Sequence, residues 1–222
     1  LLRYADVLAL SAPSLGVLVV VGGATALFAS VVMLTQTSVK VALAYSTVAQ
    51  MGFMMLQCGL GAFAPALLHI VAHSLYKAHA FLASGSVIDL ARASWTPSPG
   101  GAPHPGRVVL VIAIVLGATL AVGAAFGATL VAQPAVVALG AILLLGLTHL
   151  IASGVDERPN AYVIARTLGS AVAVAGAYFA LQAGAAALTA DSLPAAPRLE
   201  DPLDLALLAL VVLGFAAITV FQ

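Results

Sequence analysis

The sequence predicts an all-α membrane protein: a polytopic transmembrane helix bundle with about seven spans. Of its 222 residues, 63% are hydrophobic and only 7% are charged, whereas a soluble domain carries about 25% charged residues. The mean hydropathy is +1.15. Apolar runs of about 20 residues, long enough to cross a hydrocarbon core, recur between short polar or Pro/Gly-rich breaks. We expect one transmembrane domain over residues 1–222, and we interpret it as a fragment because it ends within an apolar run.

The composition excludes several functional classes and leaves the lipid bilayer as the main partner. A formal net charge of zero argues against a nucleic-acid partner. The single cysteine, Cys58, excludes an internal disulfide and a cysteine-cluster metal site. The chain shows no nucleophile–base pair and no Gly-rich phosphate loop. We therefore expect no metal, no cofactor and no catalysis by this chain alone.

The first two spans are expected at 13–34 and 39–58, after a mixed segment over 1–10. Pro13 suits the first position of a helix, because the missing N–H has no helical partner there. Ser38 is a candidate cap for the second span. A polar break between these spans and apolar residues within them predict a helical hairpin.

A tight turn over 59–62 leads to the central span, expected at 62–91. Three ionisable residues lie four positions apart within it: His69, His73 and Lys77. Four residues slightly exceed one helical turn, so these side chains form a slanting row on one face, roughly 12 Å from end to end. We call these three residues the His–Lys row.

The His–Lys row is the strongest functional signal in the sequence. Ionisable groups inside a span are costly and commonly line a proton or ion path. Removal from water favours a neutral lysine, and histidine exchanges protons near neutral pH, so the row could carry protons. Taken singly, a buried histidine is more often a packing residue, and a lysine near a helix end reaches the interface. Lys77 lies near the middle of its span, which favours proton transfer; His79 lies on roughly the opposite face.

A Pro/Gly-rich loop over 94–106 ends the central span, because no helix continues through such a sequence. The remaining spans are expected at 108–131, 135–152, 161–188 and from 203 onward. Most loop Lys and Arg residues fall on the Lys40 side, which by the positive-inside rule places that side in the cytoplasm. We expect a multi-pass protein of the cell inner membrane.

Two long patterns lie within 35–87. The first, K-x-x-L-A-Y-S-T-x-x-Q-x-G, runs from Lys40 to Gly52, and the second, H-x-x-x-H-x-x-x-K-A-x-x-F-L-x-S-G-S, runs from His69 to Ser86. Together they resemble the antiporter-like proton-translocating membrane subunits, which include the large antiporter-like subunits of respiratory complex I and the Mrp-type cation/proton antiporters. The resemblance marks 35–91 as the family signature helices and 92–222 as divergent C-terminal helices.

The resemblance implies roles for individual residues. It makes Lys77 the central protonatable lysine of a half-channel, with His69 and His73 linking it to neighbouring polar groups. Lys40 would lie at the membrane edge, with a possible role there. The family's first half is absent, and no lysine follows Lys77, where complex I subunits carry a later Lys or Glu. The amino-acid sequence of these spans is most similar to the DabB-type branch of the family. Members of this branch pair with a large soluble DabA-type subunit in inorganic-carbon uptake.

We therefore expect a proton-conducting membrane subunit that drives bicarbonate or CO2 uptake with a DabA-like partner. One alternative is an antiporter-like subunit of NADH-quinone oxidoreductase or of a Mrp antiporter, with other complex subunits as partners. Another is a structural membrane anchor, which would have no need of Lys77 at mid-depth. His149, near the end of the fifth span, is either an interfacial histidine or a far-side group that exchanges protons with Lys77.

Overall fold

The computed structural model describes four ranges of the chain: 1–93, 105–153, 161–194 and 202–221. Side chains in these ranges are described except near several helix ends, among them 84–93 and 149–153. The described residues form eight α-helices and one short 3-10 turn, with no strand among them. The predicted all-α fold is therefore confirmed.

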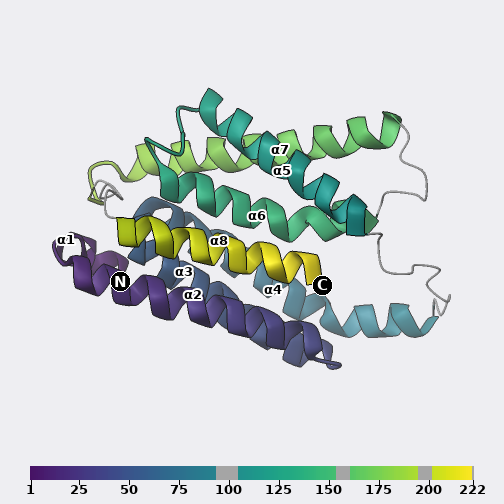
Figure 1. The fold of residues 1–222 in the computed structure, drawn as a ribbon. Helices are drawn as coiled ribbons and strands as arrows, with labels where there is room; N and C mark the ends of the chain where they lie inside the picture. Colours follow the sequence, from purple (N-terminus) through teal and green to yellow (C-terminus); the bar gives the residue numbers. More distant parts are fainter. Residues whose placement is uncertain (94–104, 154–160, 195–201, 222) are drawn as a thin grey trace. The chain divides into compact units, whose positions relative to one another are not determined.

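The described residues fall into two compact units, each with its own interior. Unit 1 holds the N-terminal elements (Figure 1): η1 (Leu2–Tyr4), α1 (Ala5–Ala9), α2 (Ala12–Thr35), α3 (Val39–Gly59) and α4 (Phe63–Ala93). Unit 2 holds the C-terminal helices: α5 (Pro105–Ala125), α6 (Pro134–Ser153), α7 (Ala161–Thr189) and α8 (Pro202–Phe221). The expectation of a single transmembrane domain stays a prediction.

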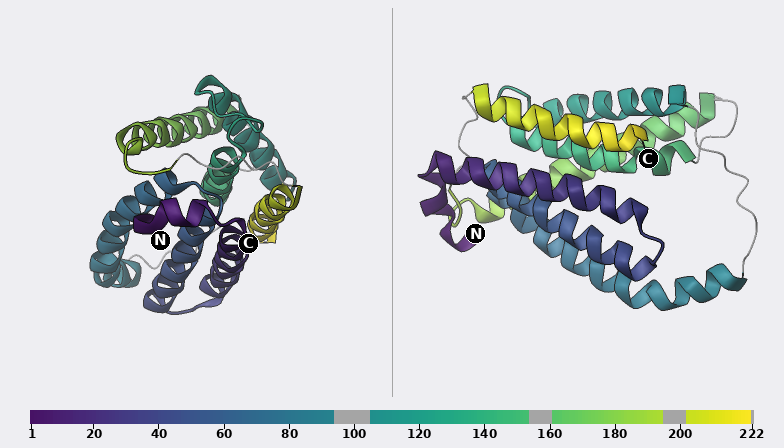
Figure 2. Two further views of the ribbon diagram at one scale, coloured as in Figure 1. Left: turned by 90° about the vertical axis from the view of Figure 1, so that its left-hand side faces the viewer. Right: turned by 60° about the horizontal axis from the view of Figure 1, so that its bottom comes forward.

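In unit 1, α2 and α3 lie side by side at very short range (Figure 2). Glycine makes this possible, because small residues let helix backbones approach closely. A Cβ placed on Gly22 would lie 2.4 Å from the backbone N of Leu56, and one on Gly59 would lie 2.6 Å from that of Val19. The bounds of both helices agree with the predicted spans to within a residue at each end.

The turn between α3 and α4 fixes their antiparallel pairing. Gly61 adopts a positive φ of 69°, which glycine reaches without steric cost. The Gly61 N–H donates to the Cys58 carbonyl at 3.0 Å, and the Ala62 N–H donates to the Gln57 carbonyl at 2.9 Å. This pair of bonds is the Schellman pattern that closes many helices at a glycine. The turn therefore sets the register in which α4 packs along α3.

A small apolar cluster surrounds this turn. Buried Leu15, Cys58, Phe63 and Ala66 pack together there, with Ala5 from α1. Its members come from four helices of unit 1, so the cluster joins the short N-terminal helix to both sides of the turn. The start of α4 is thereby held firmly, one turn and a half before the first histidine of the His–Lys row.

In unit 2, α6 contacts α5, α7 and α8 (Figure 1). A buried apolar cluster joins three of these helices, with Val115 from α5, Leu144 from α6 and Ala175 from α7 fully enclosed. Alanine at such positions leaves room for neighbouring helices to approach.

The predicted end of the fourth span is wrong. The apolar run continues to Val131, but α5 ends at Ala125, and the chain then turns before α6 begins. Gly127 has a φ of 75°, and the Ala128 N–H donates to the Gly123 carbonyl at 2.8 Å, again in the Schellman pattern. Hydropathy alone does not detect this stop, because the residues that leave the helix are themselves apolar.

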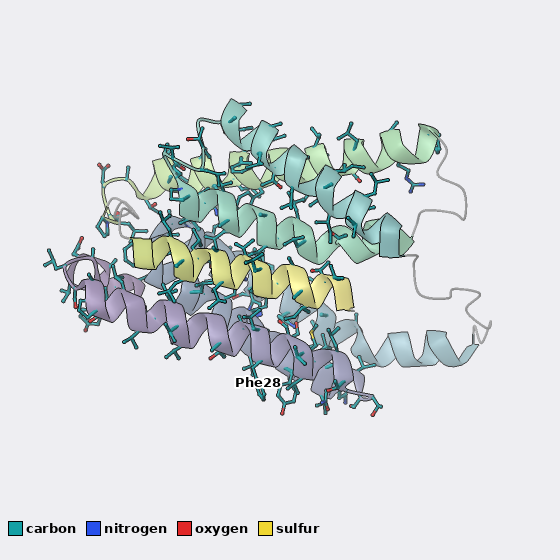
Figure 3. All side chains as sticks on the ribbon, viewed as in Figure 1. Phe28 is labelled. Atoms are coloured by element: carbon teal, nitrogen blue, oxygen red, sulfur yellow. The ribbon has the colours of Figure 1, made fainter. Side chains whose placement is uncertain are left out.

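Three helices within the described residues are long and apolar enough to cross a membrane: Ala12–Thr35, Val39–Gly59 and Leu168–Thr189. Three further helical segments within the described residues are also apolar but shorter: Val109–Ala125, Pro134–Gly146 and Leu205–Val220. Large apolar side chains face outward, as Phe28 does on α2 at 71% exposure (Figure 3), which suits contact with lipid. The chain is a multi-pass helical membrane protein, and the crossing by the central helix α4 stays a prediction.

Candidate functional site

The candidate site lies along the contact between α3 and α4 in unit 1. On α3, Ser46, Gln50 and Gln57 follow one another at intervals of one or two turns and therefore share a face. On α4, the His–Lys row has the same property. Because the two helices run antiparallel, residues near the end of α3 meet residues near the start of α4. Residues nearer the start of α3 meet residues further along α4. The hydrogen bonds between the two helices described below follow this register.

Lys77 is buried, with only 6% of its surface exposed. Its Nζ donates to the Ser46 hydroxyl at 2.7 Å and to the Leu43 carbonyl at 3.2 Å. Both acceptors are uncharged, so they stabilise an ammonium group less strongly than a carboxylate would. The Ser46 hydroxyl can also rotate and donate to a neutral amine. The site therefore offers hydrogen bonds to both protonation states of Lys77.

His69 lies at the other end of the row, between two glutamine side chains of α3. Its Nδ1 is 3.0 Å from Gln57 Oε1, and its Nε2 is 2.7 Å from Gln50 Oε1. The ring of Phe53 meets the His69 ring edge-on, with 5.6 Å between centroids. Three residues of α3 thus hold the position and the plane of this imidazole.

His73 lies between His69 and Lys77 on α4. Its ring centroid is 6.2 Å from that of His69, in an edge-on arrangement. Its Nε2 is buried and has no hydrogen-bond partner among the described residues. Lys77 follows one turn later on the same helix face. The structure therefore joins His69 and Lys77 to α3 by hydrogen bonds and places His73 beside His69 in ring contact.

The other residues singled out from sequence lie apart from this group or outside the described side chains. Lys40 is exposed in the first turn of α3. His79 is also exposed, which agrees with its predicted place on the other face of α4. The backbone of His149 belongs to α6, but its side chain lies outside the described residues.

Sequence reasoning assigned no role to the α3 side of the site. Ser46 and Gln50 belong to the first sequence pattern, and Gln57 follows Gln50 by seven residues. A spacing of seven is two helical turns, so the shared face was a readable signal. It could not be paired with His69 before the register of the two helices was known.

Unit 2 contains a second, partly buried polar pair that the sequence did not reveal. The Tyr178 hydroxyl donates to the Val136 carbonyl at 2.9 Å, and Gln182 Nε2 donates to the Tyr178 hydroxyl at 3.2 Å. Gln182 is 7% exposed, and its Oε1 has no partner among the described residues. The pair joins α7 to α6 by a hydrogen bond within an otherwise apolar contact.

Comparison with known proteins places the site within a family region. Residues 1–96 match the family described as "NADH:quinone oxidoreductase/Mrp antiporter, TM". That range contains α2, α3 and α4, and with them every residue of the α3–α4 site.

Individual relatives extend this match. The "Probable inorganic carbon transporter subunit DabB2" of Halothiobacillus neapolitanus is 37% identical over 227 aligned residues, covering 100% of this chain and 40% of the relative. The DabB subunit of Hydrogenovibrio crunogenus is 52% identical over 89 residues, covering 40% of this chain and 17% of that protein. The "NADH-quinone oxidoreductase subunit L" of Rickettsia typhi is 42% identical over 69 residues, covering 31% of this chain and 11% of that protein.

The chain spans 40% of the length of the DabB2 relative and smaller shares of the other two. No solved structure matches the chain. The match over residues 1–96 includes the buried lysine and both histidines of the site. Residues 1–96, which carry the site, therefore belong to the NADH:quinone oxidoreductase/Mrp antiporter family, and the chain as a whole is similar to antiporter-like membrane subunits.

Proposed function

We propose that the chain is a proton-conducting subunit of an ion-coupled complex in the cell inner membrane. The observation that carries this proposal is the burial of Lys77 against two uncharged oxygens, with two histidines behind it on the same helix face. A permanently charged lysine would be poorly matched to such surroundings. A lysine that alternates between ammonium and amine is served by the Ser46 hydroxyl in both states.

In the proposed path, a proton passes from His69 to His73 and then to Lys77, or in the opposite direction. Each residue accepts a proton on nitrogen and later releases it, so the row returns to its starting state after each transfer. The histidine centroids lie 6.2 Å apart, and rotation of a side chain or a bridging water can complete such a step. Two further residues stay sequence-based candidates: Lys40 for a role at the membrane edge, and His149 for a far-side group that exchanges protons with Lys77.

We further propose that proton movement drives inorganic carbon uptake together with a soluble partner subunit. Support comes from the DabB2 relative, a probable inorganic carbon transporter subunit that is similar along the whole of this chain. A second candidate is a proton-translocating subunit of an NADH-quinone oxidoreductase, supported by the Rickettsia typhi relative over 31% of the chain. The two differ in what the subunit binds: a soluble partner in the first, respiratory complex subunits in the second.

The decisive experiment replaces Lys77 in the chromosomal gene, so that the protein is made at its natural length with its natural partners. Proton uptake into membrane vesicles is followed with a pH-sensitive dye. We expect Lys77→Ala and Lys77→Arg to abolish coupled proton uptake, because arginine keeps its proton at any working pH. Normal uptake by Lys77→Arg at equal membrane abundance would contradict a protonating lysine.

Two further measurements separate the candidate functions. Under the carbon-uptake proposal, Lys77→Ala cells grow in high CO2 but fail in air, and they lose uptake of labelled bicarbonate. Under the respiratory alternative, the same cells lose NADH-driven proton uptake in both atmospheres. His149→Leu tests the far-side candidate, since normal coupled uptake in that variant would exclude His149 from the path.

A further inference from the structure

The two glutamines beside His69 have a chemical property that a simple packing contact does not need. Gln50 and Gln57 each present the side-chain oxygen Oε1 to a different ring nitrogen of His69, at 2.7 and 3.0 Å. A neutral imidazole carries one N–H and can donate to only one of these oxygens, whereas an imidazolium donates to both. In this arrangement, the protonated form of His69 has a complete set of hydrogen bonds.

The same two residues can also serve the neutral form. If either side-chain amide rotates so that its oxygen and nitrogen exchange places, the NH2 group replaces Oε1 beside His69. That NH2 group donates to an unprotonated ring nitrogen. The oxygen and nitrogen ends of an amide have nearly the same shape, so the rotation needs no extra space. Because either Gln50 or Gln57 can rotate, a proton can leave from either nitrogen of His69.

The surroundings hold the ring in place while the amides adjust. Gln57 is 4% exposed, and its backbone carbonyl is bound in the Gly61 turn by the Ala62 N–H at 2.9 Å. Phe53, between the two glutamines on α3, packs edge-on against His69 at 5.6 Å. The His69 ring is therefore fixed by its neighbours, and rotation of a flanking amide is the smallest movement that matches a change of protonation.

We propose that Gln50 and Gln57 are positioning residues that allow His69 to gain and release a proton. This inference rests on the proposed proton path and names the groups that serve its first histidine. The titratable groups beside His69 are His73, in ring contact with it, and Lys77, one turn beyond. On α3, Cys58 follows Gln57 directly, and α2 carries no titratable side chain.

The test uses the pH profile of proton uptake in vesicles from cells that carry each variant in the chromosomal gene. Gln57→Leu leaves one nitrogen of His69 without a partner, and we expect at least a tenfold lower rate. Gln57→Glu supplies a carboxylate that accepts but, when ionised, never donates, and that favours the imidazolium. We expect its half-maximal rate to move upward by about one pH unit, because His69 then releases its proton only at higher pH.

A matched control and a second background separate positioning from packing. Met51→Leu changes an exposed residue next to Gln50 and is expected to leave both rate and pH profile unchanged. In a His69→Phe background, which the proposed path leaves without uptake, the readout is the midpoint of thermal unfolding: Gln57→Leu should lower it no further, because its effect acts through His69. A further fall of the midpoint in that background would overturn the inference and assign Gln57 a packing role.

The outcomes also separate this inference from the function on which it rests. If Lys77→Ala is inactive while Gln57→Leu and Gln57→Glu keep the normal rate and profile, the proton path stands and the role of the glutamines is refuted. If Lys77→Ala itself conducts protons normally, the proposed path fails, and the positioning role fails with it.

Discussion

Gly52 of α3 lies with its Cα directly against the backbone of Gly22 on α2. A Cβ added to Gly52 would come within 2.9 Å of the Gly22 carbonyl oxygen and within 2.7 Å of the Ala26 nitrogen. Both neighbours are backbone atoms, which cannot rotate away. The contact fixes one face of α3 against α2, while the adjoining residues Ser46 and Gln50 present another face to α4. α3 therefore has two roles: one face packs against α2, and another face carries residues of the site.

We expect Gly52→Ala to destabilise the protein, because its new methyl group overlaps the backbone of α2. Overpacking of this kind costs about 1–3 kcal/mol. Thermal unfolding in detergent, followed by loss of solubility, should show a clearly lower midpoint. Gly16→Ala is the control, since a Cβ on Gly16 meets nothing within 4 Å. Equal midpoints for the two variants would mean that the close approach of α2 and α3 is not maintained in the membrane.

Ser46→Ala removes the hydroxyl that binds Lys77 Nζ at 2.7 Å. A hydrogen bond to a charged group contributes about 1.5–3 kcal/mol, so we expect at least about a tenfold fall in the rate of proton uptake. Ser74→Ala on α4 is the matched control, because its hydroxyl is exposed and binds only its own helix, at the Ile70 carbonyl. A rate unchanged by Ser46→Ala would show that the Lys77 amine does not depend on this hydroxyl.

His73→Ala should impair proton uptake far more than His79→Ala. His73 lies between the other two members of the His–Lys row, whereas the His79 side chain is exposed. Uptake is to be compared at equal membrane abundance, so that poor insertion is not mistaken for lost conduction. Equal defects in the two variants would place the path elsewhere.

Tyr178→Phe should lower stability slightly, whereas Gln182→Met should leave it unchanged or raise it. The first removes the hydrogen bond from Tyr178 to the Val136 carbonyl, and such bonds between membrane helices contribute about 0.6 kcal/mol on average. The second removes a buried amide oxygen that has no partner among the described residues, together with the 3.2 Å bond from Gln182 Nε2 to the Tyr178 hydroxyl. Because the loss of the unpartnered oxygen offsets the loss of this bond, we expect unchanged or higher stability. Thermal unfolding of both variants checks this, and a large loss in Gln182→Met would show that this oxygen is satisfied in the membrane.

The sequence predicted the helices well where apolar runs are bounded by polar or helix-breaking residues. α2 has Pro13 in its first turn, as expected, and both helices end within a residue of the expected bounds. Ser38 precedes α3 at the N-cap position, but its side chain makes no capping hydrogen bond. The end of α5 was missed because its signal is conformational: Gly127 takes a positive φ within a run that remains apolar. The spacing of four residues likewise predicted that His69, His73 and Lys77 share one face of α4. Such a shared face depends only on the geometry of a single helix.

The α3 half of the site could not be predicted in the same way. Pairing of Gln57 with His69 depends on the register between two antiparallel helices, and the Gly61 turn sets that register. The Tyr178–Gln182 pair needs knowledge of which face of α7 meets α6. Which residues of two helices meet depends on the tertiary structure, and a single sequence indicates this only indirectly.

The hydrogen bonds of the site join residues that are close in the chain. They bridge 12 residues between Gln57 and His69 and 34 between Leu43 and Lys77. Short separations favour early pairing, because little chain entropy is lost when the loop closes. We therefore expect the α3–α4 hairpin to assemble the site during synthesis, as it enters the bilayer and before the ribosome has made α5 to α8. Lys77 would then acquire its partners as it is buried, so that its ammonium group need not enter lipid alone.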